Sequence, residues 1–188
     1  MSGFDYKLAF HCAPTLAGVK PANLISIRHG DWDTIKAGIA RSGRIFAGKG
    51  IYFRRLVFCE KHVLLLVYRR DMLIKRLALP ENRRILEHYG YEPDGVVGTQ
   101  LNRLAARIAN SDGFPHEIGI FLGYPPEDVL GFIEHGGKNY RLCGCWKVYE
   151  DIAGAKRLFS AYEHARCFYC ACVLGGEEIQ NIQYGGIA

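Results

Sequence analysis

The chain has 188 residues, of which 49% are hydrophobic and 23% are charged, and its formal net charge is +5. This length is typical of one domain with a proper core, and no apolar run approaches the roughly 20 residues that cross a bilayer. We therefore expect a soluble globular protein that forms a single domain over residues 1–188, with a loose C-terminal tail from about residue 175.

The N-terminus and the cysteines both bear on localisation. The sequence MSGFDYKLAF lacks the basic start, apolar centre and small-residue cleavage site of a secretory signal. Seven cysteines, an odd number without a regular framework of spacings, are more typical of reduced thiols than of disulfides. The sequence thus predicts a cytoplasmic protein without membrane association, in which at least one thiol is chemically active.

The first half of the chain is basic. Between residues 20 and 90 there are fifteen Lys and Arg against six acidic residues, and the segment RIFAGKGIYFRRL interleaves aromatic residues with cations. Nucleic-acid-binding surfaces often have this pattern, but so do solvated strand faces, and no recognised signature accompanies the charge. Binding of nucleic acid or phosphorylated ligands is therefore kept as a second alternative function.

Apolar periodicity and turn residues predict the elements of the first half. In chain order we expect a strand over 6–12, a short helix over 21–27, a longer helix from Asp31 to Gly48, and paired strands over 51–59 and 62–69. The last two form the strongest signal, because they are rich in β-branched and aromatic residues and only a short turn separates them.

The second half predicts helices and strands in alternation. We expect a helix interrupted near Pro80, a helix opened by Thr99, a buried strand over 117–123, a helix over 125–135, a strand over 140–149 and a long helix capped by Asp151. The expected fold class is α+β, with one mixed sheet of about five strands and helices packed on it.

Strand, helix and strand over 117–149 have the length of a parallel crossover, which places His116, Glu117 and Cys143 toward one edge of the sheet. If the first strand runs antiparallel to them, it brings Cys12 to the same edge. If it runs parallel, Cys12 meets the turn at Gly123 and Tyr124 and the following helix N-terminus, a position suited to binding an anionic cofactor.

In the antiparallel arrangement Cys12, His116 and Glu117 supply the parts of a catalytic site. An imidazole favours the thiolate form of a neighbouring cysteine, and a carboxylate often orients that imidazole. Cys12 is then expected to be the most reactive thiol. The competing interpretation is a buried cysteine that packs as a small hydrophobe beside a hydrogen-bonded histidine.

The same region offers a metal site as an alternative. His11, Cys12, His116 and Cys143 are all ligands that zinc or iron accepts, although their spacing is not that of a recognised motif. Cys143 and Cys145 fall on one face of the expected strand, where they are too constrained for an easy disulfide but could form part of a metal site. Cys167, Cys170 and Cys172 fall beside the apolar stripe of the last helix, where packing is the more frequent role.

Three stretches of the sequence, HCAPTLAGVKPANL, FPHEIGIFLGYPPEDVLGFI and LCGCWKVY, resemble the signatures of an uncharacterised bacterial family. This family is common in anaerobic Firmicutes and is described only as a domain of unknown function. The resemblance covers nearly the whole chain, and Cys145 stands where such proteins often have an aromatic residue. The family is associated with iron-uptake and flavodoxin genes, which suits a metal or redox role.

The function that the sequence favours is that of a thiol-dependent enzyme or redox protein with a site at Cys12 and His116. An iron- or zinc-binding accessory protein is the first alternative, since the candidate ligands are the same residues. The substrate and any small-molecule or protein partner are left open.

Overall fold

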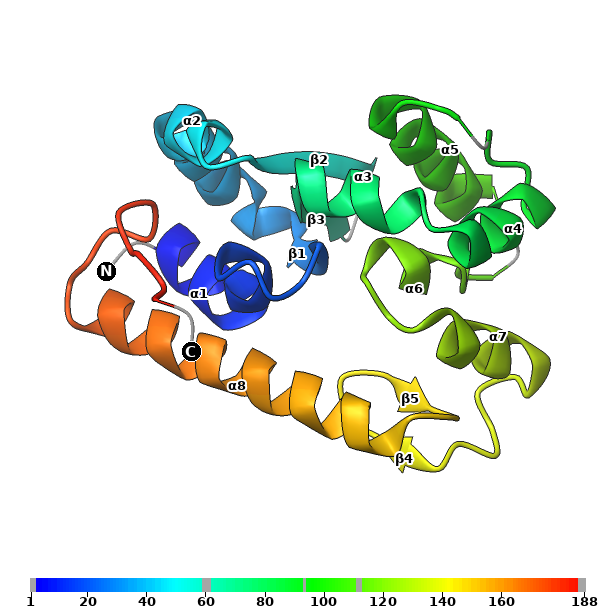
Figure 1. The fold of residues 1–188 in the computed structure, drawn as a ribbon. Coiled ribbons are helices and arrows are strands. Elements are labelled where there is room, and N and C mark those ends of the chain that lie inside the picture. Colours follow the sequence, from blue (N-terminus) through cyan, green and yellow to red (C-terminus); the bar gives the residue numbers. More distant parts are fainter. Residues whose placement is uncertain (1–2, 59–61, 93, 111–112, 186–188) are drawn as a thin grey trace. The chain divides into compact units, whose positions relative to one another are not determined.

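The structure, a computed structural model, describes residues 3–58, 62–92, 94–110 and 113–185 (Figure 1). Its elements in chain order are α1 (Gly3–Leu16), β1 (Ala22–Arg28), η1 (His29–Asp31), α2 (Trp32–Gly48), β2 (Ile51–Phe58), β3 (His62–Arg69), α3 (Arg70–Leu77), α4 (Pro80–His88), α5 (Val97–Asn110), α6 (Ile118–Phe121), α7 (Pro126–Glu134), β4 (Leu142–Cys143), β5 (Lys147–Val148) and α8 (Ile152–Leu174).

The α+β class is confirmed, but the expected single sheet is not. In the described part of the chain the strands form one sheet of three and a separate sheet of two. The chain divides into two compact units. The first unit comprises Met1–Asp71 and Ala161–Ala188, and the second comprises Met72–Ser160. Within the described ranges, no helix combines the length and the apolar character that crossing a membrane requires.

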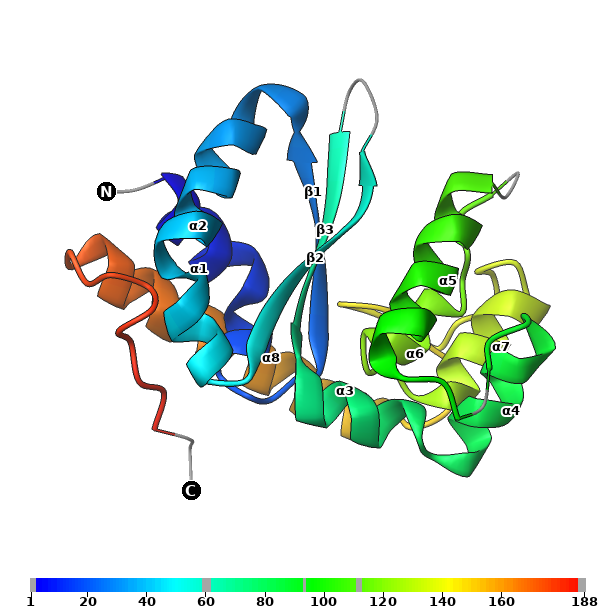
Figure 2. The ribbon, with the colours of Figure 1, turned by 90° about the horizontal axis from the view of Figure 1, so that it is seen from above.

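The first unit is built on an antiparallel sheet with the strand order β1-β3-β2. Ile25 lies opposite Leu65 in one pair of strands and Phe53 lies opposite Val67 in the other, and a bulge interrupts β2 between Arg55 and Val57. Helices α1 and α2 contact one face of this sheet (Figure 2), so the apolar side chains of that face are buried in a common core. The predicted helix from Asp31 and the predicted hairpin are both confirmed.

The predicted first strand over 6–12 is wrong, because these residues belong to helix α1. Phe4, Leu8, Cys12 and Leu16 recur every four residues, and all four are buried in the core of the first unit. A spacing of four places them along one helical stripe. The seven-residue window that predicted a strand was too short to contain this repeat, and Pro14 is accommodated within the helix.

The predicted helix over 21–27 is also wrong, since this segment forms strand β1. Ile25 and Ile27 are buried, whereas Ser26 and Arg28 between and after them are exposed. This alternation is the period of a strand with one face on a core. Pairing with β3 along its whole length gives the segment the hydrogen bonds that a helix would otherwise supply.

The segment after Gly175, expected to be a loose tail, packs on the first unit in its described part. Ile179 and Ile182 are 1% and 3% exposed and belong to the core cluster. The Lys49 Nζ atom donates hydrogen bonds to the carbonyl oxygens of Gln180, at 2.7 Å, and Ile182, at 3.5 Å. Buried side chains and a lysine from α2 therefore hold residues 179–182 in place.

The second unit contains mostly helices, and several predictions for it are confirmed. Helix α3 ends at Leu77 and α4 begins at Pro80, as expected for an interruption near this proline. Helix α7 begins with Pro126 in its first turn. Asp151 caps α8 through its Oδ1 atom, which accepts a hydrogen bond of 2.8 Å from the Gly154 backbone N–H.

The predicted strands over 117–123 and 140–149 are wrong, and the parallel crossover that they implied is therefore not formed. Residues Ile118–Phe121 make the single turn α6, and the later segment folds back on itself as the antiparallel hairpin β4–β5. A short apolar run does not distinguish a buried strand from a buried helical turn. Gly119 allows α7 to pack closely on this turn, because a Cβ at this position would lie 2.7 Å from Val129 of α7.

Candidate functional site

Cys12, the predicted nucleophile, is inaccessible. Its side chain is 0% exposed on α1, within the core of the first unit, and this burial raises the pKa of its thiol to about 12. A buried thiol in apolar surroundings is chemically inert. The adjacent residue His11 is exposed, and its ring packs edge-on against the Phe10 ring with centroids 4.9 Å apart.

Glu117, the predicted orienting carboxylate, is engaged in a buried network. It is 1% exposed, and its Oε1 atom accepts hydrogen bonds from Tyr91 Oη, at 3.1 Å, and from Arg107 Nε. Burial beside this carboxylate raises the pKa of Tyr91. Glu117 thus ties α5 and the loop after α4 to the start of α6, while the adjacent His116 is exposed.

His116 and Cys143 do line the same cavity, together with Tyr124. This cavity lies within the second unit and has a volume of about 360 Å³. Its walls are apolar and aromatic, and three of its lining residues carry reactive or polar groups that the sequence analysis singled out: His116, Tyr124 and Cys143. Gly123 does not line it but has a positive φ of 79°, which lets the chain turn into the Tyr124 position.

A second cysteine, Cys145, lines this cavity and was not among the predicted site residues. Cys143 ends strand β4 and Cys145 lies in the turn to β5, and both thiols are free and exposed. The turn is closed by a hydrogen bond of 3.0 Å from the Gly144 N–H to the Trp146 carbonyl oxygen. Gly144 is required here, because a Cβ would lie 2.2 Å from the Phe159 ring.

Asp128 anchors this turn to α7. The carboxylate is 3% exposed and accepts hydrogen bonds from Trp146 Nε1, at 2.7 Å, and from the backbone N–H groups of Tyr149 and Glu150, at 2.7 and 3.3 Å. Trp146 in turn stacks on Tyr124 with centroids 4.9 Å apart. The hairpin that carries the two cysteines is therefore held to a helix by a buried acceptor.

The polar groups of the cavity lie among aromatic rings. The His116 imidazole packs edge-on against Phe132 at 4.7 Å, and the Lys147 Nζ atom lies 5.5 Å from the same ring while donating to the Gly137 carbonyl oxygen at 2.5 Å. Tyr124 Oη donates to the Cys145 carbonyl oxygen at 3.4 Å. Burial raises the pKa of Tyr124 to about 12, so its phenol stays protonated near neutral pH.

The remaining cysteines lie elsewhere. Cys167, Cys170 and Cys172 are on α8; Cys167 is exposed, and burial raises the pKa of the other two. Cys59 lies outside the described residues. Across the ranges that the structure describes, no three His, Cys, Asp or Glu side chains are grouped so that they could hold a metal ion. The four predicted ligands are divided between α1 of the first unit and the cavity of the second.

One feature of the sequence could have indicated the pair of Cys143 and Cys145. The segment Cys143-Gly-Cys-Trp146 places two thiols on either side of a glycine, and a small residue between them is needed where backbone and ring approach closely. The sequence did not indicate that this segment folds into a turn. In the continuous strand that the sequence predicted, the pair was considered only as a possible part of a metal site.

We expect Cys12 to be the slowest of the described cysteines to react with iodoacetamide in the folded, reduced protein. Peptide mapping after timed labelling at neutral pH measures this order. Cys143, Cys145 and Cys167 should be modified first because they are exposed. In urea, where the core is open, Cys12 should react at the rate of an ordinary thiol. Rapid labelling of Cys12 without denaturant would contradict its burial.

The raised pKa of Cys12 also predicts a pH dependence of stability. An unfolded cysteine has a pKa of about 8.5, whereas burial raises the pKa of folded Cys12 to about 12. Below pH 8.5 both states keep the proton and the contribution is constant. From there to about pH 12 only the unfolded state loses the proton, so the free energy of unfolding falls by about 1.4 kcal/mol per pH unit. Urea denaturation of wild-type protein and of Cys12→Ala at pH 8 and 10 isolates this slope as the difference between the two proteins, because Cys170 and Cys172, whose pKa burial also raises, contribute to both.

An α+β protein with a pair of exposed thiols beside an aromatic cavity is the class that this fold and site define. The sequence profile of the family described as "Protein of unknown function (DUF3793)" matches residues 8–183, and the chain belongs to this family. Neither the curated proteins nor the solved structures include one that matches the chain.

Proposed function

We propose that this protein is a thiol-dependent redox protein whose reactive pair is Cys143 and Cys145. The observation that carries the proposal is the convergence of two exposed free thiols and the His116 imidazole on one cavity of about 360 Å³. We assign the reactive role to this pair and not to Cys12, because Cys12 is buried and burial raises the pKa of its thiol.

The reaction that these groups suit is two-step exchange with a substrate disulfide. One cysteine attacks a sulfur of the substrate and releases the other sulfur as a thiol, which leaves a mixed disulfide. The second cysteine then attacks the mixed disulfide, forms the Cys143–Cys145 bond and releases the second thiol. The substrate gains two electrons and the cysteine pair loses two. The two protons leave the cysteines and end on the released thiols.

Each of the neighbouring residues has a part in this reaction. The His116 imidazole is the proton carrier, because it lines the same cavity as both thiols. The Lys147 ammonium adds positive charge beside the cysteines, where thiolate develops. The rings of Phe132, Tyr124 and Trp146 offer an apolar surface to the body of the substrate.

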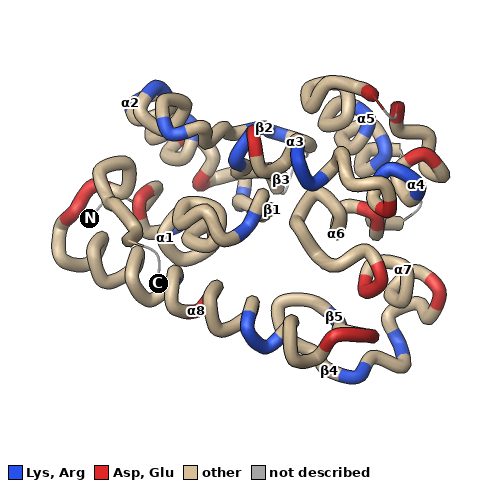
Figure 3. The backbone as a smooth tube through the Cα atoms, viewed as in Figure 1, with Lys and Arg blue, Asp and Glu red and all other residues tan. Residues whose placement is uncertain are grey.

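A redox role of this kind places the protein in a reducing compartment such as the cytoplasm, where small thiols return the pair to its reduced form. Binding of nucleic acid through the basic first half stays a prediction. Lys and Arg recur along α2 and β2 (Figure 3), and Arg54 and Arg55 are exposed on β2. Arg55 lies over the Phe58 ring at 5.4 Å, which is typical of a solvated strand face.

The proposal is tested by mapping the disulfide that forms when the reduced protein meets less than one equivalent of 5,5′-dithiobis(2-nitrobenzoate). Trypsin cleaves after Arg141 and Lys147, so the peptide from Leu142 to Lys147 contains both cysteines and no other. We expect this peptide to lose two hydrogens, with two aromatic thiolates released for each reagent molecule consumed. Cys143→Ser and Cys145→Ser should each stop at a mixed disulfide or fail to react.

Two further variants sharpen this test. His116→Gln should slow formation of the internal disulfide by about 100-fold at neutral pH, since general acid–base catalysis contributes at least this much. Cys167→Ser removes another exposed thiol, on α8, and should react as the wild type does. The proposal fails if the reagent distributes equally over Cys143, Cys145 and Cys167 and no internal disulfide appears.

A further inference from the structure

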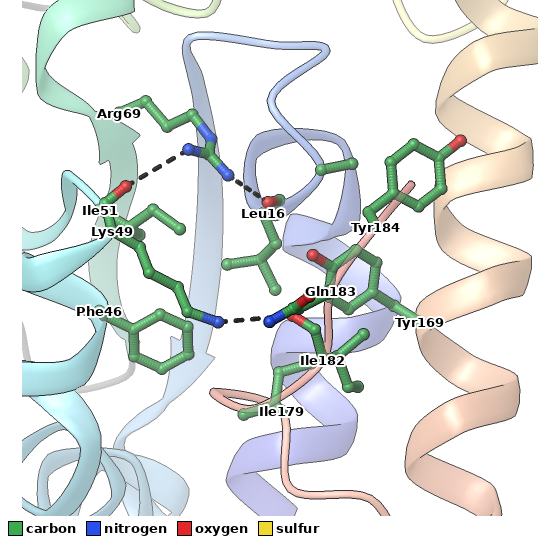
Figure 4. Close-up of a pocket in the computed structure, with 11 residues that line it drawn as sticks. Leu16, Phe46, Lys49, Ile51, Arg69, Tyr169, Ile179, Ile182, Gln183 and Tyr184 are labelled. Carbon is green, nitrogen blue, oxygen red and sulfur yellow. Dashed lines mark hydrogen bonds between the residues drawn. The ribbon is translucent and has the colours of Figure 1, made fainter. Parts of the chain in front are cut away.

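The first unit contains a second cavity, with a volume of about 290 Å³ (Figure 4). It lies where the ends of α1 and α2, the start of β2 and the C-terminal segment meet. Two cationic side chains, Lys49 at the end of α2 and Arg69 at the end of β3, line it, while its other walls are mostly apolar or aromatic. None of its lining residues, all of which the structure describes, is acidic.

Within the described part of the chain, the hydrogen-bond acceptors of Arg69 are backbone carbonyl oxygens. Its Nε atom donates to the Thr15 carbonyl oxygen at 2.7 Å, its Nη1 atom donates to the Lys49 carbonyl oxygen at 3.4 Å, and its Nη2 atom donates to the Leu16 carbonyl oxygen. A guanidinium group has five donor hydrogens, so two remain for another acceptor. The planar fork that these hydrogens form matches a carboxylate.

Lys49 is also held by carbonyl groups. Its Nζ atom donates to Gln180 and Ile182 of the C-terminal segment, at 2.7 and 3.5 Å, and an ammonium group has a third hydrogen. Glu178, the acidic residue of this segment closest in sequence to those acceptors, is exposed and accepts hydrogen bonds from the side chains of Gln180 and Asn181.

The positive charges of Lys49 and Arg69 are only partly compensated within the cavity. Thr15 and Leu16 are in the last turn of α1, and Lys49 is the C-cap of α2, so Arg69 also lies at two helix C-termini. Each helix C-terminus is equivalent to about half a negative charge. The two helix ends together offset about one of the two positive charges. About one positive charge is left beside a cavity with an apolar wall.

We propose that this cavity binds a small monoanion with a flat apolar body, of the class of aromatic carboxylates. The carboxylate lies between Lys49 Nζ and the Arg69 guanidinium and accepts their remaining hydrogens. The apolar body lies against Phe46, Ile182 and Tyr169, which line the same cavity. A volume of 290 Å³ is at the small end of the range for ligand pockets, which favours a single-ring compound.

Binding of benzoate to the full chain tests this inference, with benzamide as the neutral compound of the same shape and inorganic phosphate as an anion without an apolar body. Titration followed by amide chemical shifts measures affinity and location together. We expect benzoate to shift the amides of residues 180–184 and of Lys49 in a saturable way, and benzamide to bind at least tenfold more weakly. Phosphate alone should leave these amides unchanged.

Lys49→Met should weaken benzoate binding by about tenfold, because it removes a hydrogen bond between charged partners. Lys36→Met is the matched control, since Lys36 is exposed on α2 and forms an ion pair with Asp33, away from the cavity-lining residues. If Lys49→Met does not fold, the chemical-shift changes of the wild-type protein still show whether benzoate binds in this cavity. Equal binding of benzoate and benzamide, shifts only outside this cavity, or binding of phosphate in place of benzoate would each overturn the inference.

Discussion

Asp128→Ala is expected to lower the free energy of unfolding by about 3 kcal/mol and to abolish efficient formation of the Cys143–Cys145 disulfide. The substitution removes the acceptor of the Trp146 indole and of two backbone N–H groups. A buried donor left without a partner costs about 1–3 kcal/mol, and Trp146 and Tyr149 are both buried. The hairpin then loses its attachment to α7, and the two thiols lose their fixed position beside His116.

Urea denaturation followed by tryptophan fluorescence measures this effect in a Trp32→Phe background, in which Trp146 is the remaining tryptophan. Asp128→Asn keeps one oxygen acceptor and should lose about half as much stability. Glu127→Gln, at the exposed neighbouring position, should stay within about 0.5 kcal/mol of the wild type. If Asp128→Ala were as stable as this control and still formed the disulfide, the anchoring role of Asp128 would be refuted.

Glu117→Ala is expected to lower the free energy of unfolding by about 3 kcal/mol. We expect it to affect the thiol reaction only by lowering the fraction of folded protein. Removing one partner of a buried ion pair leaves the other without compensation, which typically costs about 3–5 kcal/mol. The Arg107 side chain is 23% exposed, so water relieves part of this cost and favours the lower end. The Tyr91 hydroxyl also loses its acceptor.

A double-mutant cycle with Arg107→Met measures the coupling within this pair, and Glu87→Gln, exposed on α4, is the control. Glu117→Gln retains an acceptor for Tyr91 and should fold well enough for the rate of disulfide formation to be measured. That rate should equal the wild-type rate, because Glu117 lies in the buried network and not at the cavity. A rate lowered 100-fold in folded Glu117→Gln protein would restore Glu117 to the catalytic role that the sequence suggested.

The elements that the sequence predicted correctly have strong local signals. Helix α2 has apolar residues at helical spacing and a glycine stop, the hairpin of β2 and β3 is dense in β-branched residues, and α8 begins with the cap at Asp151. In each of these, short-range preferences and the final environment favour the same structure. The local sequence was therefore sufficient to predict these elements.

The incorrectly predicted elements are short apolar segments, whose conformation depends on what covers them. Residues 118–121 form a helical turn because α7 packs against them at Gly119, and residues 22–28 form a strand because β3 pairs with them. Strand β3 is distant in the sequence from residues 22–28, and α7, although it is the next element, covers residues 118–121 only because the chain turns back between the two helices. The stripe of α1 was present in the sequence at every fourth residue, but Pro14 and the apolar run over 6–12 favoured an extended reading.

The candidate site proposed from the structure overlaps in part with the one predicted from the sequence. The sequence by itself determined the α+β class and the family, and it pointed to His116, Tyr124 and Cys143, which line one cavity. The tertiary structure decided which thiols water can reach. Cys12 and Cys143 are the same residue type in similarly apolar segments, but α1 buries one in a core and the β4–β5 turn exposes the other at a cavity. Thiol reactivity depends on desolvation and access, and both depend on contacts between residues that are distant in the sequence.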